Sequence, residues 1–414
     1  MNRAARQRSV TTEEGRKHRP DYLLVVLSVC LLVIGLIVVF AISPGLAAQR
    51  GVDSSYFVSK QLIAVGLGIA TFFITSRLSR ATWRRLIKPL IVVAIIATII
   101  ALLLPVTPEY PAHRWVRLGG FSLQAVEIIK LALLLGLSYF FAARIKSGEM
   151  GSKDKTFKPL LIVLGVVGAV VAVLQSDLGS AGVLMAMIGA IAFVAGLPMK
   201  RVLLFACVIA IGTFLAISTS EYRRDRFATY LNPERDCQNE GYQACQALIA
   251  IGSGGLIGKG FQASVAGYGY TPEAANDSIF AVYSEMFGFV GVCVLLGLFL
   301  ALFSRLKMII ERAPDNESRL IVTGVLAWIG FQAVVNIGAM AGLLPLKGIT
   351  LPLVSYGGTS IIFVSAALGI VFHISKYTTF TVNELPQTER GQHAHSAYGR
   401  GHRGAYHTPV SRRA

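Results

Sequence analysis

The sequence predicts an all-α fold, a polytopic membrane bundle of about ten transmembrane helices with a large extracytoplasmic loop between helices 7 and 8. Two observations lead to this prediction. Hydrophobic residues make up 54% of the 414 positions and charged residues only 15%, whereas soluble domains carry about 25% charged residues. The apolar residues also gather in blocks of roughly 17 to 25, the length that crosses a hydrocarbon core.

Ten such blocks divide the chain into one membrane domain over 22–376, flanked by polar tails at 1–21 and 377–414 that we expect to be disordered. The predicted spans are 22–43, 59–76, 89–105, 127–143, 159–175, 180–197, 202–219, 278–304, 320–344 and 359–376. The large loop covers 220–277. The first block is too long for the core of a signal peptide, so we expect no cleaved leader.

The net charge of +17 indicates topology rather than binding of nucleic acid. Lys and Arg residues concentrate in both tails and in alternate short connections, with six of them before the first span. The positive-inside rule then places both tails in the cytoplasm and predicts a multi-pass protein of the plasma membrane. The basic charge would also attract anionic membrane lipid.

The five cysteines divide between two environments. Cys30, Cys207 and Cys293 lie in apolar spans and are expected to be small packing residues. Cys237 and Cys245 lie in the large loop, where an oxidising compartment would favour a disulfide. A helix-like stretch between them could equally hold them apart, so the sequence leaves both outcomes open. The histidines of the tails have no fixed spacing, and no protein metal site is predicted.

The polar chemistry gathers on the predicted outer face, in the connections 107–126, 220–277 and 345–358. Long ordered connections in compact proteins are usually functional. Within the large loop, Gly252-Ser-Gly-Gly-Leu-Ile-Gly-Lys-Gly resembles a phosphate-binding loop. However, its spacing is wrong and Gly260 stands where Ser or Thr is needed. Its glycines are expected to permit tight backbone turns.

Four ionisable or amide side chains lie where spans begin or end. Glu127 and Lys130 are three residues apart on one helix face. A lone charge inside a span costs about 2.5–3.5 kcal/mol, so they either pair to orient the helix or hold a ligand, which we favour. Asp177 follows Gln175 in a turn between two spans. It is equally suited to cap the next helix and to contact substrate.

Asp277 ends the large loop where the eighth span begins, and helix capping is the alternative to a chemical role. Glu285 lies eight residues on, about two turns deeper on nearly the same face. A carboxylate at the water interface, backed by a second one, suits a general base that acts on a lipid-borne hydroxyl.

Cationic side chains surround these acids and would bind an anionic headgroup such as a pyrophosphate. We expect no more than half of them to contact the ligand. They are Arg114, Arg117, Arg223, Arg224, Arg226, Lys259 and Lys347.

Several motifs together resemble the SEDS family (shape, elongation, division and sporulation), the RodA/FtsW group. They are Arg114-Trp with Leu118-Gly and Gln124-Ala-Val-Glu-Ile-Ile-Lys, Gln175-Ser-Asp-Leu-Gly-Ser-Ala, Tyr222-Arg-Arg-Asp-Arg, and Gly348-Ile-Thr-Leu-Pro-Leu-Val-Ser-Tyr-Gly-Gly-Thr-Ser. The match follows the family's order over about 22–376. Gly267-Tyr-Gly-Tyr-Thr-Pro-Glu-Ala resembles the division-type FtsW versions.

This resemblance implies a bacterial peptidoglycan glycosyltransferase that polymerises lipid II, the undecaprenyl-pyrophosphate-linked disaccharide peptide. It also implies a class B penicillin-binding protein as partner, together with other division proteins. Asp277 falls on the family's essential aspartate, Glu127 and Lys130 on its buried acid–base pair, and Glu285 on the first acid of a Glu-Glu pair. The chain departs from the pattern at Ser278, where Phe is usual, and at Met286.

From the resemblance and the residues together, we predict that Asp277 is the catalytic base of an inverting glycosyl transfer. A divalent cation, Mg²⁺ or Mn²⁺, could assist the leaving pyrophosphate. The predicted substrate-binding residues are Glu127, Lys130, Arg114, Gln175, Asp177, Arg223, Lys259, Glu285, Lys347 and Ser355. A lipid II flippase and a non-catalytic division scaffold are the alternatives. Polar groups on one face, rather than at the midplane, favour the enzyme over a transporter.

Overall fold

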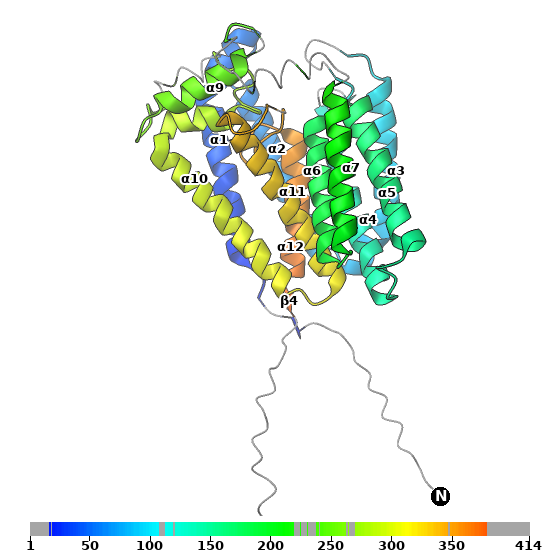
Figure 1. Ribbon diagram of the computed structural model, residues 1–414. Coiled ribbons are helices and arrows are strands. Elements are labelled where there is room, and N and C mark those ends of the chain that lie inside the picture. The colour runs from blue at the N-terminus through cyan, green and yellow to red at the C-terminus, as the bar shows by residue number, and fades with distance from the viewer. Residues whose placement is uncertain are drawn as a thin grey trace, which may run out of the picture. The chain divides into compact units, whose positions relative to one another are not determined.

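The ten predicted spans all correspond to helices in a computed structural model of the chain (Figure 1). The structure describes residues 16–17, 19–106, 112–118, 121–218, 224, 230, 237–239, 241–261, 264, 270–346 and 348–378. All of these belong to one unit, Met1–Thr379. Most of both predicted disordered tails lies outside the described residues, so their disorder stays a prediction.

The helices run up and down in chain order, joined mostly by short connections. They are α1 (Tyr22–Arg50), α2 (Tyr56–Arg77), α3 (Arg80–Leu103), α4 (Ala125–Lys146), α5 (Lys158–Gly168), α6 (Leu178–Val194), α7 (Met199–Ser218), α9 (Tyr242–Ser253), α10 (Ile279–Glu311), α11 (Asn316–Met340) and α12 (Gly358–Ile374). Two π-helical segments, η1 (Lys153–Phe157) and η2 (Ala169–Leu174), extend α5 at both ends.

Seven helical segments among the described residues are long and apolar enough to cross a membrane: α1, α2, α3, α4, α10, α11, and α5 with its π-helical extensions. Helices α6 and α12 are apolar but have 17 residues each, the lower limit for a span. Together with α7, these helices bear out the predicted polytopic bundle. Helix α9 is additional and lies inside the predicted large loop.

Two short antiparallel strand pairs depart from the all-α expectation. Strands β2 (Trp115–Leu118) and β3 (Phe121–Gln124) pair antiparallel just before α4, with Val116 opposite Leu123. Val116 is buried against Ala125 and Ile128 of α4, so the hairpin has a small apolar base. Strands β1 (Arg16–Lys17) and β4 (Tyr377–Thr378) pair where the two described chain ends meet.

Ion pairs between connections tie the bundle together at the end where β1 and β4 pair, here called the terminal end. Arg84 at the start of α3 binds Glu317 at the start of α11, with Nε 2.9 Å from Oε2. Arg305 of α10 binds Asp21, which precedes α1, with Nε 3.0 Å from Oδ2. These pairs join alternate connections, as a bundle of antiparallel helices requires.

Helices α2 and α12 approach closely because glycine stands at their crossing. A Cβ atom on Gly369 would lie 2.0 Å from Thr75 Oγ1 and 2.5 Å from the Phe72 carbonyl oxygen. Small residues allow such contacts between membrane helices, where packing rather than the hydrophobic effect holds helices together.

We therefore expect Gly369→Ala to separate α2 from α12 and to cost about 1–3 kcal/mol of unfolding free energy. The matched control is Gly297→Ala in α10, where an added Cβ meets no atom within 4 Å. The thermal unfolding midpoint of each purified variant measures the effect. Equal midpoints for the two variants would contradict the packing argument.

Candidate active site

Four segments that are far apart in sequence meet at the end of the bundle opposite β1 and β4, here called the site end. The Arg114 guanidinium of the β2–β3 region donates through Nε to the Gln175 carbonyl at 3.0 Å. Thr359 Oγ1 at the start of α12 donates to the Ser122 carbonyl at 3.1 Å. A backbone hydrogen bond from the Tyr356 amide to the Ala275 carbonyl joins the segment before α10 to the segment before α12. Described parts of the predicted outer-face connections therefore contact one another at this end.

Asp277 lies half-buried in the turn that precedes α10. The Asn336 amide of α11 donates to the Asp277 carbonyl at 2.7 Å and to the Ile349 carbonyl at 2.6 Å. A Cβ on Gly348 would lie 3.3 Å from Asp277 Oδ2, so the carboxylate points along the segment before α12. A single buried amide thus fixes the Asp277 backbone relative to this segment.

Ser355 holds the same two segments together from inside the protein. Its hydroxyl donates to the Asn276 carbonyl at 2.6 Å and accepts from the Leu351 amide at 2.7 Å. Next to it, the Tyr356 amide donates to the Ala275 carbonyl at 2.8 Å. Ser355 is 2% exposed, so these contacts make it a support for the Asp277 turn. Its predicted contact with substrate stays a prediction.

Glu127 and Lys130 form an ion pair inside the bundle. Lys130 Nζ lies 2.6 Å from Glu127 Oε1 and 3.2 Å from Gln332 Oε1, and it also lies over the Trp328 ring at 5.1 Å. Both charged side chains are 2% exposed. Because burial removes water from both ions, the pair needs these extra partners to be stable.

A polar stripe on α11 links this ion pair to the Asp277 turn. Trp328, Gln332 and Asn336 are spaced by four residues, so they lie on one helix face. Trp328 Nε1 donates to Gln332 Oε1 at 3.0 Å, and Gln332 Nε2 donates to the Thr350 carbonyl at 3.0 Å. This polar stripe was not predicted from the sequence. Two amide side chains within one predicted span were the available signal.

Arg114 and Asp177 flank the turn between η2 and α6. Asp177 caps α6, because its Oδ1 accepts from the Ser180 amide at 2.9 Å. Its Oδ2 lies 3.9 Å from Arg114 Nη1 and 3.4 Å from Gln124 Nε2. The capping role left open by the sequence is therefore present. Asp177 is 2% exposed and both of its oxygens have partners within the protein, so its predicted contact with substrate stays a prediction.

Gln175 is fully buried beside this turn. Among the described residues, neither its Nε2 nor its Oε1 atom has a hydrogen-bond partner. The same is true of Glu127 Oε2. Buried polar atoms of this kind are costly unless a water or ligand satisfies them. The role of Gln175 and Glu127 in binding substrate stays a prediction.

The Glu285 side chain of α10 is buried against residues 252–260, here called the glycine-rich loop. Its carboxylate accepts from Lys259 Nζ at 2.9 Å, from Ser253 Oγ at 3.2 Å and from Ser264 Oγ at 2.8 Å. With 2% exposure, it is held by this loop. These contacts hold the loop against α10. Direct contact of Glu285 or Lys259 with substrate stays a prediction.

The glycine-rich loop packs against a kink in α10. Gly288 has φ 62° and ψ −165°, and a Cβ there would lie 2.3 Å from the Gly258 nitrogen. The interrupted helix bonds are replaced by contacts to the loop, such as the Gly260 amide to the Met286 carbonyl at 3.0 Å. The expected role of these glycines in tight turns is thus confirmed, since Gly258 and Gly260 also have positive φ.

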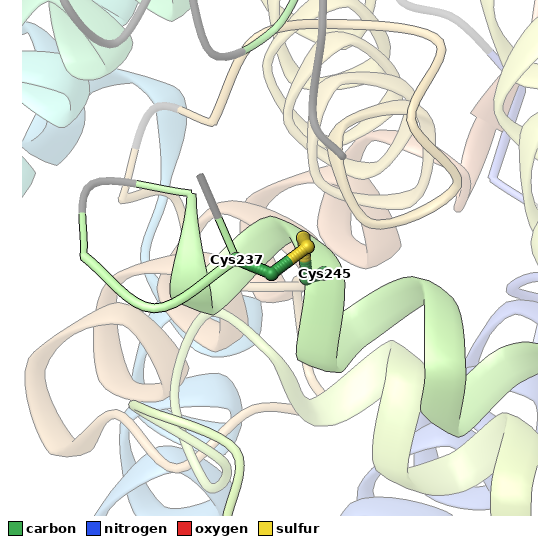
Figure 2. The surroundings of a disulfide bond; sticks show 2 residues. All are labelled: Cys237 and Cys245. Atoms are coloured by element: carbon green, nitrogen blue, oxygen red, sulfur yellow. A yellow bond between two sulfur atoms is a disulfide. The ribbon is translucent and has the colours of Figure 1, made fainter. Parts of the chain in front are cut away.

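The large loop contains the disulfide that the sequence left open. Cys237 and Cys245 are joined, with their Cα atoms 5.6 Å apart, at the start of α9 (Figure 2). From the same turn of α9, Gln243 Nε2 donates to Ser278 Oγ at 3.2 Å. The disulfide therefore fixes a helix turn that contacts the residue after Asp277.

Only some of the remaining predicted site residues lie in the described part of the chain. Arg223 and Lys347 lie outside the described residues, as does Arg226. Arg117 donates to the Pro105 carbonyl, so at least one of its donors is used within the protein. No group of three or more His, Cys, Asp and Glu side chains that could hold a metal ion occurs in the described part of the chain.

Comparisons with known proteins agree with this architecture. A sequence model of the cell cycle protein family that comprises FtsW, RodA and SpoVE matches residues 22–380. Stage V sporulation protein E of Bacillus subtilis is 34% identical over 368 residues, 88% of this chain and 99% of that protein. A probable peptidoglycan glycosyltransferase FtsW of Haemophilus influenzae is 35% identical over 363 residues, 86% of this chain and 90% of that protein.

Solved structures show the same fold. A chain from a peptidoglycan synthase complex, described as coordinating polymerisation and crosslinking, superposes with a TM-score of 0.70 at 29% identity, covering 86% of this chain and 98% of that one. The rod shape determining protein RodA of Thermus thermophilus superposes with a TM-score of 0.62 at 29% identity, covering 86% and 97%.

The ion pair generates a test of its own. Glu127→Gln or Lys130→Met alone leaves one buried charge without its partner, which costs about 3–5 kcal/mol. The double variant removes both charges, so we expect it to recover most of the unfolding midpoint. If the double variant is as unstable as either single variant, the two charges do not act as a pair.

The disulfide predicts a specific pattern of thiol labelling. Unfolded, non-reduced protein should take up alkylating reagent at Cys30, Cys207 and Cys293 only. After reduction, all five cysteines should react. Cys237→Ser should add one reactive thiol, at Cys245, before reduction. Labelling of five cysteines in the non-reduced wild type would show that the bridge is absent.

Proposed function

Because the chain belongs to the family of FtsW, RodA and SpoVE, we propose that it is a peptidoglycan glycosyltransferase that polymerises lipid II at the site end of the bundle. The observation that carries the proposal is the Asp277 turn. A half-buried carboxylate stands at the membrane boundary, and its backbone is held by the buried Asn336 amide. Relatives named as probable peptidoglycan glycosyltransferases support the same activity.

In the proposed reaction, the Asp277 carboxylate removes the proton from the 4-hydroxyl of the acceptor sugar. The hydroxyl oxygen attacks the anomeric carbon of the donor sugar, and the bond between that carbon and the pyrophosphate oxygen breaks. Undecaprenyl pyrophosphate leaves with the electron pair, and the configuration inverts. One positioned base contributes about 10²–10⁴-fold to such a step.

The leaving pyrophosphate carries negative charge that positioned cations would stabilise. The Arg114 guanidinium is held at the site end by its bond to the Gln175 carbonyl. We propose that it faces the headgroup together with Arg223 and Lys347. A divalent cation, when bound, would neutralise part of the charge on the leaving pyrophosphate.

Glu127 and Lys130 act through Gln332 in this scheme. The ammonium of Lys130 holds the Gln332 oxygen, which turns the Gln332 amide toward the Thr350 carbonyl. Thr350 lies between Gly348, which faces Asp277, and Ser355. The buried pair therefore positions the segment that borders the general base. We also propose that the unsatisfied Glu127 oxygen accepts a hydrogen bond from substrate or water.

We further propose that the terminal end faces the cytoplasm and the site end the outside of a bacterial plasma membrane. The distribution of basic residues supports this orientation, and a disulfide at the site end suits an oxidising compartment. The division-type motifs support a septal role with a class B penicillin-binding protein as partner. The structural similarity to a chain of a peptidoglycan synthase complex supports such an assembly.

The central experiment compares glycan chain formation from labelled lipid II by the wild type and Asp277→Asn, each purified with its penicillin-binding partner. We expect Asn, which cannot accept the proton, to lower the rate by about 10²–10⁴-fold. The matched control is Asp53→Asn. Asp53 is an exposed carboxylate in the connection between α1 and α2, and hydrogen bonds from Ser55 hold its pKa below the ordinary value.

The control should polymerise at the wild-type rate, because the Asp53 carboxylate is ionised but does not contact the Asp277 turn. Full activity of Asp277→Asn would remove Asp277 as the base. If neither the wild type nor the variant forms chains in an intact complex supplied with divalent ions, a lipid II flippase or a division scaffold becomes the better interpretation.

A further inference from the structure

A cavity of about 220 Å³ opens at the terminal end, far from the candidate active site. It lies where α1 begins and where α10 and α12 end. Its lining consists of Arg19, Pro20, Asp21, Arg305, Met308, Ile309, Arg312, Ser375 and Tyr377. We call it the arginine cavity. None of its residues takes part in the proposed glycosyl transfer.

The arginine cavity carries an excess of positive charge. Its lining contains three guanidinium groups and one carboxylate. The carboxylate of Asp21 is already used, since Arg305 Nη2 lies 2.8 Å from its Oδ2 and the Leu24 amide donates to its Oδ1. Arg312 is exposed and has no ion-pair partner within the described part of the chain. An anion in the cavity would therefore find an available guanidinium.

The walls of this cavity are built before any ligand arrives. The Asp21 amide donates to Ser375 Oγ at 3.0 Å, which ties the start of α1 to the end of α12. The Ser375 hydroxyl in turn donates to the Phe372 carbonyl at 2.8 Å. The β1–β4 pairing places Lys17 opposite Tyr377 on the outer side of the same connection. Little ordering would be needed on binding, which favours affinity.

The position of the arginine cavity at the membrane boundary indicates a ligand that is partly apolar. The helices that frame it cross the membrane, so their ends mark the membrane boundary. Met308 and Ile309 form an apolar part of the lining. Tyr22 is largely exposed and packs edge-on against Phe372, with centroids 5.9 Å apart, and tyrosine is typical of the membrane interface. Water-facing arginines thus stand directly above an apolar surface.

We propose that the arginine cavity binds the phosphodiester headgroup of an anionic glycerophospholipid. Arg312 and Arg19 would donate to the phosphate oxygens, in the geometry that guanidinium groups favour. The first acyl carbons would lie on Met308 and Ile309. Basic pockets between membrane helices at the cytoplasmic side recognise anionic headgroups in this way. A soluble phosphate shares the headgroup chemistry but would gain nothing from the apolar part.

The test uses the full chain in nanodiscs of phosphatidylcholine with an increasing fraction of phosphatidylglycerol. Native mass spectrometry of the released protein counts the retained phosphatidylglycerol molecules. We expect Arg312→Ala to weaken retention at one site about tenfold, the effect of losing one charge-assisted hydrogen bond. The matched control is Lys307→Ala, which removes an exposed cation of α10 that pairs with Glu311 at 3.8 Å. It should retain phosphatidylglycerol like the wild type.

Several results would overturn the proposal. Equal losses in Arg312→Ala and Lys307→Ala would indicate general surface charge, and no loss in Arg312→Ala would remove the site. Displacement of the lipid by inorganic phosphate at millimolar concentration would indicate a soluble anion. Met308→Ser provides a second check, because it should weaken retention of phosphatidylglycerol without changing the charge. Arg312 and Met308 both line the cavity near the end of α10. The unfolding midpoint confirms that each variant is folded.

Discussion

The buried ammonium of Lys130 is the constraint on which the site end depends. Inside a bundle that excludes water, such a group must find all its partners within the protein. The structure provides Glu127, the oxygen of Gln332 and the face of Trp328. Gln332 can serve Lys130 only with its oxygen, so its amide nitrogen must point the other way, toward the segment before α12. One buried charge thereby orients a segment on the surface.

The same logic explains why α11 organises the site although it contributes no predicted catalytic residue. Its amide side chains lie one helical turn apart and each binds a carbonyl of an irregular segment. Asn336 bridges the Asp277 and Ile349 carbonyls, so the turn that contains Asp277 cannot move independently of the segment before α12. Irregular backbone at the membrane boundary is tolerated because these side chains replace the hydrogen bonds that a helix would provide.

The sequence was sufficient to predict the ten helices that correspond to the expected spans, because membrane thickness requires a long apolar run in each. It was not sufficient for the β2–β3 hairpin, whose strands of four residues carry no periodic pattern that differs from a loop. Nor did it place Glu285. Helical spacing put Glu285 on the face of Asp277, but its carboxylate binds the glycine-rich loop, a contact between distant segments. The same limit applies to Gln332 and Asn336, whose partners only the fold reveals.

The departure at Ser278 illustrates how a local change can be compensated. The family pattern places an aromatic ring after the aspartate, and here a hydroxyl stands in its place. The Ser278 hydroxyl donates to the Pro272 carbonyl at 2.8 Å and accepts from Gln243 of α9. Burial of an unpaired hydroxyl would cost about 1–3 kcal/mol, which the Pro272 carbonyl offsets, and the second bond from Gln243 ties Ser278 to α9. The Cys237–Cys245 bridge lies in that same turn, so the hydroxyl and the disulfide form one connected support for Asp277.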